Sequence, residues 1–165
     1  MQRLIIFIGI VVIASVFRFT GINWDQHAHL HPDERFLTMV ATDIHWPQSA
    51  GEYFDTKISS ANPHNVGHGF YVYGTYPVHL VKLVAQAVKK DTYEGITIVG
   101  RTMSGVVDLA TLVFVFLIGG NLAAFLYAIM VLPIQQSHFF TVDPYATLFL
   151  TISLYLLIKK RIGWL

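Results

Sequence analysis

The sequence contains no cysteine and few charged side chains. Without cysteine the chain has no disulfide bond, no thiolate metal site and no cysteine nucleophile. Cysteine usage therefore does not indicate whether the protein works in an oxidising or a reducing compartment. Charged residues make up 13% of the 165 residues, against about 25% in soluble domains, while hydrophobic residues make up 54%. The net charge of +1 provides no basic surface for nucleic acid. These deficits favour a membrane protein that does not bind nucleic acid.

The apolar residues gather in a few long segments. Residues 4–17 form an unbroken run of apolar and small residues, 96–132 are mostly apolar, and a further apolar stretch covers 145–158. A bilayer core of about 30 Å needs roughly 20 helical residues, so the segment 96–132 is too long for one crossing. Gly119-Gly120-Asn121 is the strongest turn signal within it. We therefore expect an all-α membrane protein, a single module over 1–165, with about four transmembrane helices near 3–22, 96–118, 121–137 and 142–158.

The first apolar run has two interpretations. Its length also suits a cleavable signal peptide. However, no clear cleavage site of small residues follows, and Arg18 stands just after the run. We prefer a retained helix, with the Arg18 side chain reaching to the membrane interface.

Basic residues near the ends of the spans predict the orientation. Lys159-Lys160-Arg161 follows the last span and Arg3 precedes the first, which places both termini in the cytoplasm, whereas Lys89-Lys90 argues against it. The polar segment 23–95 is then a long extracytoplasmic loop of a plasma (inner) membrane protein. Apolar residues at helical spacing over 36–44 and 76–88 predict two amphipathic helices on the membrane surface within this loop.

The densest group of ionisable residues opens that loop, in the sequence His31-Pro32-Asp33-Glu34-Arg35. Pro32 suits the first turn of a helix, and acids there stabilise the positive end of the helix dipole, so a structural role is one reading of Asp33 and Glu34. His27, His29 and His31 are candidate metal ligands. Their alternation puts them on one face only in an extended segment, and the spacing indicates no fourth ligand. We prefer hydrogen-bonding histidines and no cofactor, with a divalent metal as the alternative.

Two acids lie in or beside the apolar segments. Asp108 is within the second span, where an acid is costly and is by default a functional candidate. Arg101 lies seven residues earlier on roughly the same helix face, so a structural ion pair is the alternative. Asp143 precedes Pro144 at the outer start of the last span, where it either caps the helix or serves the site.

Several motifs together resemble a known family. They are His31 to Arg35, Asn62-Pro63, Tyr73-Gly74, Gly100-Arg101-x-x-Ser104 and Ser137-His138-Phe-Phe-x-x-Asp143. This pattern is similar to the N-terminal module of the GT-C superfamily of polytopic membrane glycosyltransferases. Within it, the branch of protein O-mannosyltransferases and lipid A aminoarabinose transferases is nearest, especially bacterial members with a His-Pro-Asp-Glu-Arg motif.

The resemblance implies a function and a set of site residues. The reaction is transfer of a sugar from a polyprenyl-phosphate donor to an acceptor hydroxyl on the extracytoplasmic side, with inversion. Asp33 is implied as the general base, with Glu34 beside it and Asp143 as a second acid facing the same cavity. Arg35, Arg101 and His138 are the candidates for binding the donor phosphate. One base is enough, because a lipid phosphate leaves as a stable anion, unlike the leaving group of a glycosidase.

The sequence departs from the family in two respects. Members of the superfamily have many more spans, and their connection between spans two and three is longer and basic. We therefore expect a fragment or truncated form of a larger fold. The alternative function is a non-catalytic accessory subunit of a larger membrane complex, packed through the small residues Gly100, Ser104, Gly105 and Ala110. A histidine-rich metal or proton site in a transporter is a third interpretation, although no inverted repeat accompanies it.

Overall fold

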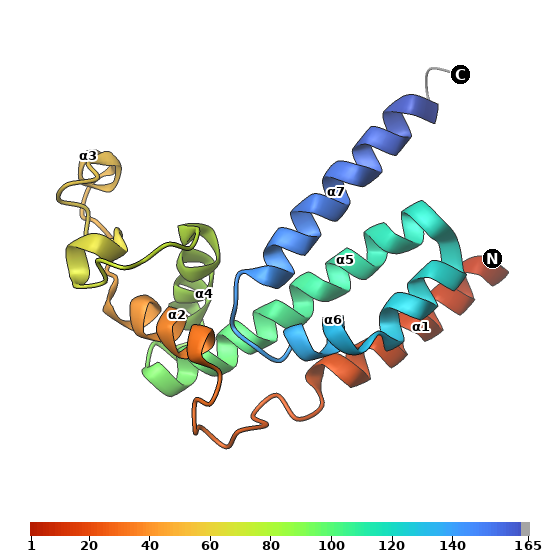
Figure 1. Cartoon of the computed structure of the whole chain (residues 1–165), viewed down its shortest axis with the longest axis horizontal. Helices are drawn as coiled ribbons and strands as arrows, with labels where there is room; N and C mark the ends of the chain where they lie inside the picture. The colour runs from red at the N-terminus through yellow and green to blue at the C-terminus, as the bar shows by residue number, and fades with distance from the viewer. Residues whose placement is uncertain (163–165) are drawn as a thin grey trace. The chain divides into compact units, whose positions relative to one another are not determined.

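The computed structural model describes residues 1–162, and all regular secondary structure in that range is helical. The expected all-α class is thereby confirmed. Two helices, α1 (Gln2–Phe19) and α5 (Tyr93–Ile129), are long and apolar enough to cross a membrane (Figure 1). The chain divides into two compact units. Unit 1 comprises residues 1–24 and those from 101 onward, and unit 2 comprises residues 25–100.

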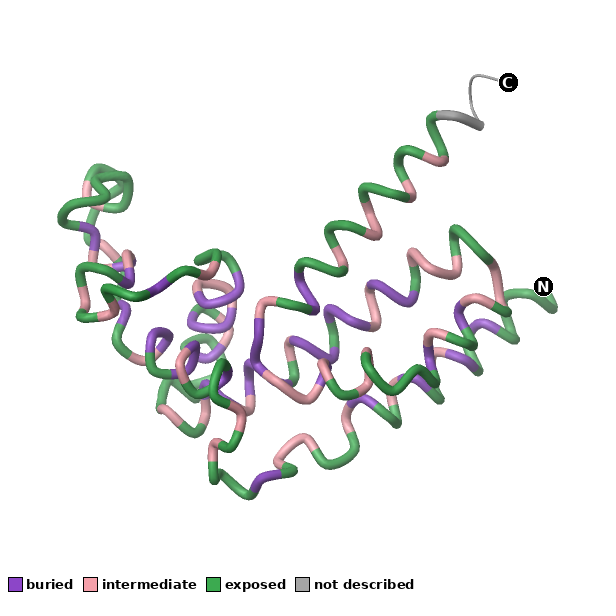
Figure 2. Tube along the Cα trace, in the orientation of Figure 1, coloured by how far each residue is buried: buried purple, intermediate pink, exposed green. Residues whose placement is uncertain are grey.

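Unit 1 has a narrow core and a broad apolar surface. Its buried cluster draws on α1 and both parts of α5, with Phe7 stacked on Phe116 at 3.9 Å between ring centroids. Buried and exposed positions alternate along both helices (Figure 2). Among the exposed side chains are Ile5, Ile8 and Val12. An apolar surface of this kind is typical of a protein that lies against lipid.

Gly120 divides α5 into two parts. Its φ of 73° and ψ of −163° interrupt the helix, which confirms the break expected at Gly119-Gly120-Asn121. Figure 1 shows the chain turning back after the first part, and the Asn121 side chain donates to the Arg3 carbonyl of α1 at 3.2 Å. The returning segment breaks again at Met130 and continues as α6 (Val131–Gln136). The chain then enters α7 (Asp143–Ile162).

Alanine at Gly120 should destabilise the chain by about 1–3 kcal/mol, because side chains are strained in this backbone region. Gly9→Ala is the matched control: Gly9 lies inside α1 with open space where a Cβ would be, so alanine there should stabilise by about 0.5–1 kcal/mol. The free energy of unfolding, measured by SDS titration in mixed micelles, checks both. Equal effects at the two glycines would contradict the assigned turn.

A buried ion pair joins α1 to both parts of α5. The Arg18 side chain is fully buried, and its Nε donates to the Asp108 carboxylate. Its Nη1 also donates to the Ala128 carbonyl at 2.9 Å, and the Tyr127 hydroxyl donates to Asp108 at 2.5 Å. Two expectations were therefore wrong. Arg18 does not reach to the interface, because its charge is neutralised inside, and the partner of Asp108 is Arg18 and not Arg101.

Removal of one member of this pair leaves the other charge buried and unpaired. Arg18→Met should therefore destabilise the chain by about 3–5 kcal/mol, and the double variant Arg18→Met/Asp108→Leu should recover at least half of that loss. Arg3→Gln is the control, because Arg3 is exposed and lies 5.1 Å from the Phe116 ring; it should cost about 1 kcal/mol or less. SDS titration of the wild type, Arg18→Met, Asp108→Leu and the double variant gives the coupling energy, and additive effects of the two single variants would refute a direct interaction.

Unit 2 is built around two packed helices. They are α2 (Pro32–Asp43) and α4 (Thr75–Ala87), and they bury Leu37, Val40, Val78 and Val81 between them. Their positions agree with the two helices expected from apolar spacing. Thr38 of α2 contacts Thr97 of α5 at 3.2 Å between hydroxyl oxygens.

The segment between α2 and α4 is ordered without regular periodicity. It contains the short helices α3 (Ala50–Phe54) and η1 (Pro63–Val66). On α4, the buried Lys82 lies 2.8 Å from the Asp91 carboxylate. Partial burial raises the pKa of Asp91, but the hydrogen bonds from Lys82 and Gln86 and the Lys82 charge outweigh it, so the pKa is lowered overall.

Candidate functional site

The two neighbouring acids at the start of α2, Asp33 and Glu34, differ in their exposure to solvent. Pro32 occupies the first turn, and the His31 ring accepts a hydrogen bond from the Glu34 backbone N–H at 3.3 Å, which fixes where the helix begins. Asp33 and Arg35 are exposed, whereas Glu34 is fully buried. Successive residues of an α-helix point about 100° apart, so only one acid of the pair turns into the unit. Asp33 is therefore the acid of the pair that is open to solvent.

Asp33 is held by a residue forty positions away. The Tyr73 hydroxyl donates to Asp33 Oδ1 at 3.2 Å, and no other partner of this carboxylate occurs among residues 1–162. The Tyr73 ring lies beside Phe36 and Tyr71, at centroid distances of 6.3 and 6.0 Å. Tyr71 donates to the Gly74 carbonyl, and burial raises its pKa to about 12, which keeps this hydroxyl neutral. This aromatic cluster positions one carboxylate oxygen and leaves the other open.

Two histidines before α2, His27 and His29, contact Glu94 at the start of α5. His29 Nε2 lies 3.1 Å from one oxygen of Glu94, and His27 pairs with the other oxygen. Gln26, His27 and His29 have φ values of 50°, 67° and 49°, in the left-handed region that non-glycine residues rarely adopt. His31 caps α2 instead. The described residues contain no group of three side chains arranged to hold a metal ion, so the metal alternative gains no geometric support.

Asp143 lies in unit 1, at the start of α7. It lines a cavity of about 270 Å³ together with Asp108, Tyr127 and Gln136. Asp108 is engaged by Arg18 and Tyr127, whereas Asp143 is exposed at the cavity edge. Two acids therefore border one cavity of unit 1. The expected pairing of Asp143 with Asp33, which belongs to unit 2, stays a prediction.

Arg101 and His138 hold the segment that follows α1. Arg101 is fully buried; it donates to the Ile22 carbonyl at 3.0 Å and lies 5.4 Å from the Trp24 ring centroid. His138 Nε2 is 2.9 Å from the Thr20 carbonyl and Nδ1 is 2.7 Å from the Ile134 carbonyl. The binding of phosphate by either residue stays a prediction, and Arg35 is the exposed cation of the α2 motif.

The small residues expected to pack against partner helices are used inside unit 1. Ser104 and Gly105 are buried. A Cβ on Gly105 would lie 2.8 Å from the Phe19 ring, so this glycine allows α1 and α5 to approach each other. Packing within the chain explains Gly105, and the accessory-subunit interface stays a prediction.

Sequence reasoning missed two functional candidates of unit 2. One is Tyr73, whose contact with Asp33 has no local sequence signal, although Tyr73-Gly74 stood out as part of a motif. The other is a hydroxyl-lined cavity around Tyr53 and His79, which lies largely in the segment without periodicity.

Comparisons of the chain with protein-family models, with curated proteins and with solved structures find no match.

Proposed function

We propose that the chain is part of a membrane glycosyltransferase that moves a sugar from a polyprenyl-phosphate donor to an acceptor hydroxyl at the extracytoplasmic face. The observation that carries this proposal is the exposed carboxylate of Asp33, with one oxygen held by Tyr73 and the other open. This is the arrangement that a positioned general base requires. The resemblance of the motif around Asp33 to GT-C enzymes supports the same role.

In the proposed reaction, the open oxygen of Asp33 takes the proton of the acceptor hydroxyl. The acceptor oxygen attacks the anomeric carbon, and the bond from that carbon to the phosphate oxygen breaks with its electron pair on the phosphate. The products are an inverted glycoside and polyprenyl phosphate, and protonated Asp33 then returns its proton to water. Glu34 is proposed to support the start of α2 from its buried position, and Asp143 to serve as the second acid.

The donor phosphate needs cationic or hydrogen-bonding partners as charge develops on it. We assign this role first to Arg35, because its side chain is exposed two residues after Asp33. His138 borders an open cavity of about 460 Å³ with Trp24 and Phe139 and is the second candidate. Arg101 would have to leave its buried contacts to reach a phosphate, and it is the weakest of the three.

The proposed topology has four crossings, with both termini in the cytoplasm of a bacterial cell and the chain in its inner membrane. The crossings are α1, the first part of α5, the segment from Gly120 through α6, and α7. The turn at Gly120 supports the second and third, and the 20 residues of α7 cover about 30 Å, the thickness of a bilayer core. This topology puts unit 2 outside, where lipid-linked sugars are the available donors.

Asp33→Asn should reduce sugar transfer by about 10²–10⁴-fold, because an amide does not accept the proton of the acceptor. The assay uses membranes that contain the protein and a panel of undecaprenyl-phosphate monosaccharides labelled in the sugar. Asp43→Asn is the matched control, since Asp43 lies at the other end of α2 and pairs with His68 at 2.8 Å. It should transfer at close to the wild-type rate. Unchanged transfer by Asp33→Asn would refute the proposed function.

Tyr73→Phe should lower kcat about 3- to 10-fold with little change in KM, because one hydrogen bond that orients the base is lost. Tyr71→Phe is the control: its hydroxyl bonds the Gly74 carbonyl in the same aromatic cluster but does not touch Asp33. Steady-state kinetics, measured with the sugar donor identified in the transfer assay, would distinguish Tyr73→Phe from Tyr71→Phe. If both variants slowed the reaction equally, the contact with Asp33 would have no special role.

A further inference from the structure

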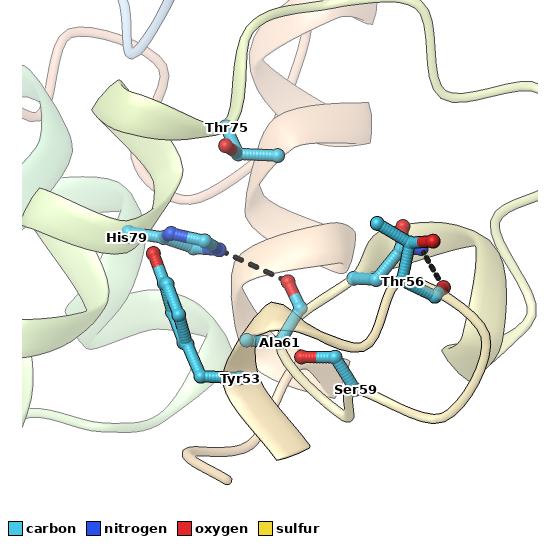
Figure 3. A pocket seen from close by; sticks show the side chains of 7 residues that line it. Tyr53, Thr56, Ser59, Ala61, Thr75 and His79 are labelled. Atoms are coloured by element: carbon cyan, nitrogen blue, oxygen red, sulfur yellow. Dashed lines mark hydrogen bonds between the residues drawn. The ribbon is translucent and has the colours of Figure 1, made fainter. Parts of the chain in front are cut away.

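Unit 2 contains a cavity that the proposed chemistry at Asp33 does not use. It has a volume of about 280 Å³, near the lower end of the range for ligand sites. Figure 3 shows its lining side chains around one hollow, drawn from α3, the turns after it and the start of α4. They include Tyr53, Thr56, Ser59, Ala61, Thr75 and His79. A neighbouring hollow of about 330 Å³ shares three of these residues and adds Trp46 and Tyr76.

The cavity walls are fixed by contacts of their own. His79 Nε2 donates to the Ala61 carbonyl at 3.0 Å, which joins α4 to the turns (Figure 3). The Asn62 amide donates to the Thr56 carbonyl at 2.8 Å. Trp46 contacts the His79 ring at 5.7 Å and donates to Gln86 at 2.6 Å. Walls held in this way bind a ligand without first being ordered by it, which lowers the cost of binding.

The lining is rich in hydroxyl groups and carries no fixed charge. Within the described chain, the hydroxyls of Thr56, Ser59 and Thr75 make no hydrogen bond, and neither does that of Tyr53. Ser59 is only 3% exposed, so its hydroxyl has little access to solvent outside the cavity. No Asp, Glu, Lys or Arg of the described chain lines either hollow. Hydroxyls both donate and accept, and they match a ligand that does the same.

Aromatic rings complete the site. Tyr53 and Trp46 are both partly exposed beside His79, so their faces are accessible. An aromatic ring offers a large, rigid apolar face with a negative quadrupole, against which the C–H groups of a ligand stack. A phosphate or carboxylate would lose hydration here without finding a fixed counter-charge. The lining therefore selects a neutral ligand with C–H faces and many hydroxyls.

We propose that this cavity binds a neutral carbohydrate ring, which stacks on Tyr53 and exchanges hydrogen bonds with Ser59, Thr75 and the free nitrogen of His79. The binding stands on the cavity alone. The assignment of that carbohydrate as the sugar acceptor rests on the proposed function, because Asp33 lies in the same unit.

The test is saturation-transfer difference NMR on the full chain in nanodiscs, with methyl α-D-mannopyranoside and methyl β-D-glucopyranoside as probes. At least one glycoside should bind, and Tyr53→Leu should weaken its binding at least about fivefold. Phe54→Leu is the matched control: it removes the neighbouring exposed ring of α3, which does not line the cavity, and should change binding less than about twofold. Thr75→Val is a second variant, which removes one hydroxyl at an exposed position, and circular dichroism checks the fold of each protein.

The outcomes separate this proposal from the proposed function. Failure of both glycosides to bind, or equal binding by the wild type, Tyr53→Leu and Thr75→Val, would overturn the carbohydrate site. Asp33→Asn should bind the glycoside as the wild type does, because Asp33 is not in the lining. Loss of binding in Tyr53→Leu together with full transfer by Asp33→Asn would uphold the site and refute the catalytic role.

Discussion

The ion pair between Arg18 and Asp108 is the interaction on which unit 1 depends. It joins α1 to the first part of α5, and the contacts of Arg18 and Asp108 with Ala128 and Tyr127 bring in the segment after Gly120. Three stretches up to 110 residues apart in the sequence therefore meet at one buried point. A buried charge without its partner is costly, in protein or in lipid, so α1 and α5 have one favourable register. The turn at Gly120 brings Tyr127 and Ala128 back beside Asp108 and Arg18.

Ionisable groups are used in different ways in the two units. In unit 1, Arg18, Asp108 and Arg101 are buried and engaged by neighbours, which is a structural use of charge. In unit 2, the buried Lys82 of α4 pairs with the exposed Asp91, and Asp33 and Arg35 are exposed at the start of α2. The buried groups therefore make structural contacts within their own unit, and the proposed chemistry rests on the exposed Asp33 and Arg35.

Local signals in the sequence predicted much of the fold. The glycine pair at 119–120 indicated the turn, because glycine alone adopts the backbone angles found there without strain. Pro32 and the apolar spacing after it predicted α2, and similar spacing predicted α4. The partner of Asp108 was not predictable in this way. Helical periodicity relates Arg101 and Asp108 on one helix, but it carries no information on which other helix packs against them.

The site was predictable only in part for the same reason. The motif at 31–35 identified Asp33 and Glu34 as candidates, but the choice between them depends on which face of α2 packs on α4. The contact of Tyr73 with Asp33 and the cavity at Tyr53 and His79 arise from irregular segments folded across the unit. No period or spacing encodes such contacts, so they become visible only with tertiary structure.

In the proposed topology the chain crosses the membrane and unit 2 lies on the outer side. Because the sequence has no cysteine, single cysteines report on this without interference. The two variants are Lys57→Cys and Lys159→Cys. Lys57 lies in unit 2 and Lys159 lies near the end of α7, and both side chains are exposed. In intact spheroplasts, a membrane-impermeant maleimide should label the cysteine at 57 at once and the cysteine at 159 only after permeabilisation. Labelling of both before permeabilisation, or of the cysteine at 57 only after it, would contradict the account.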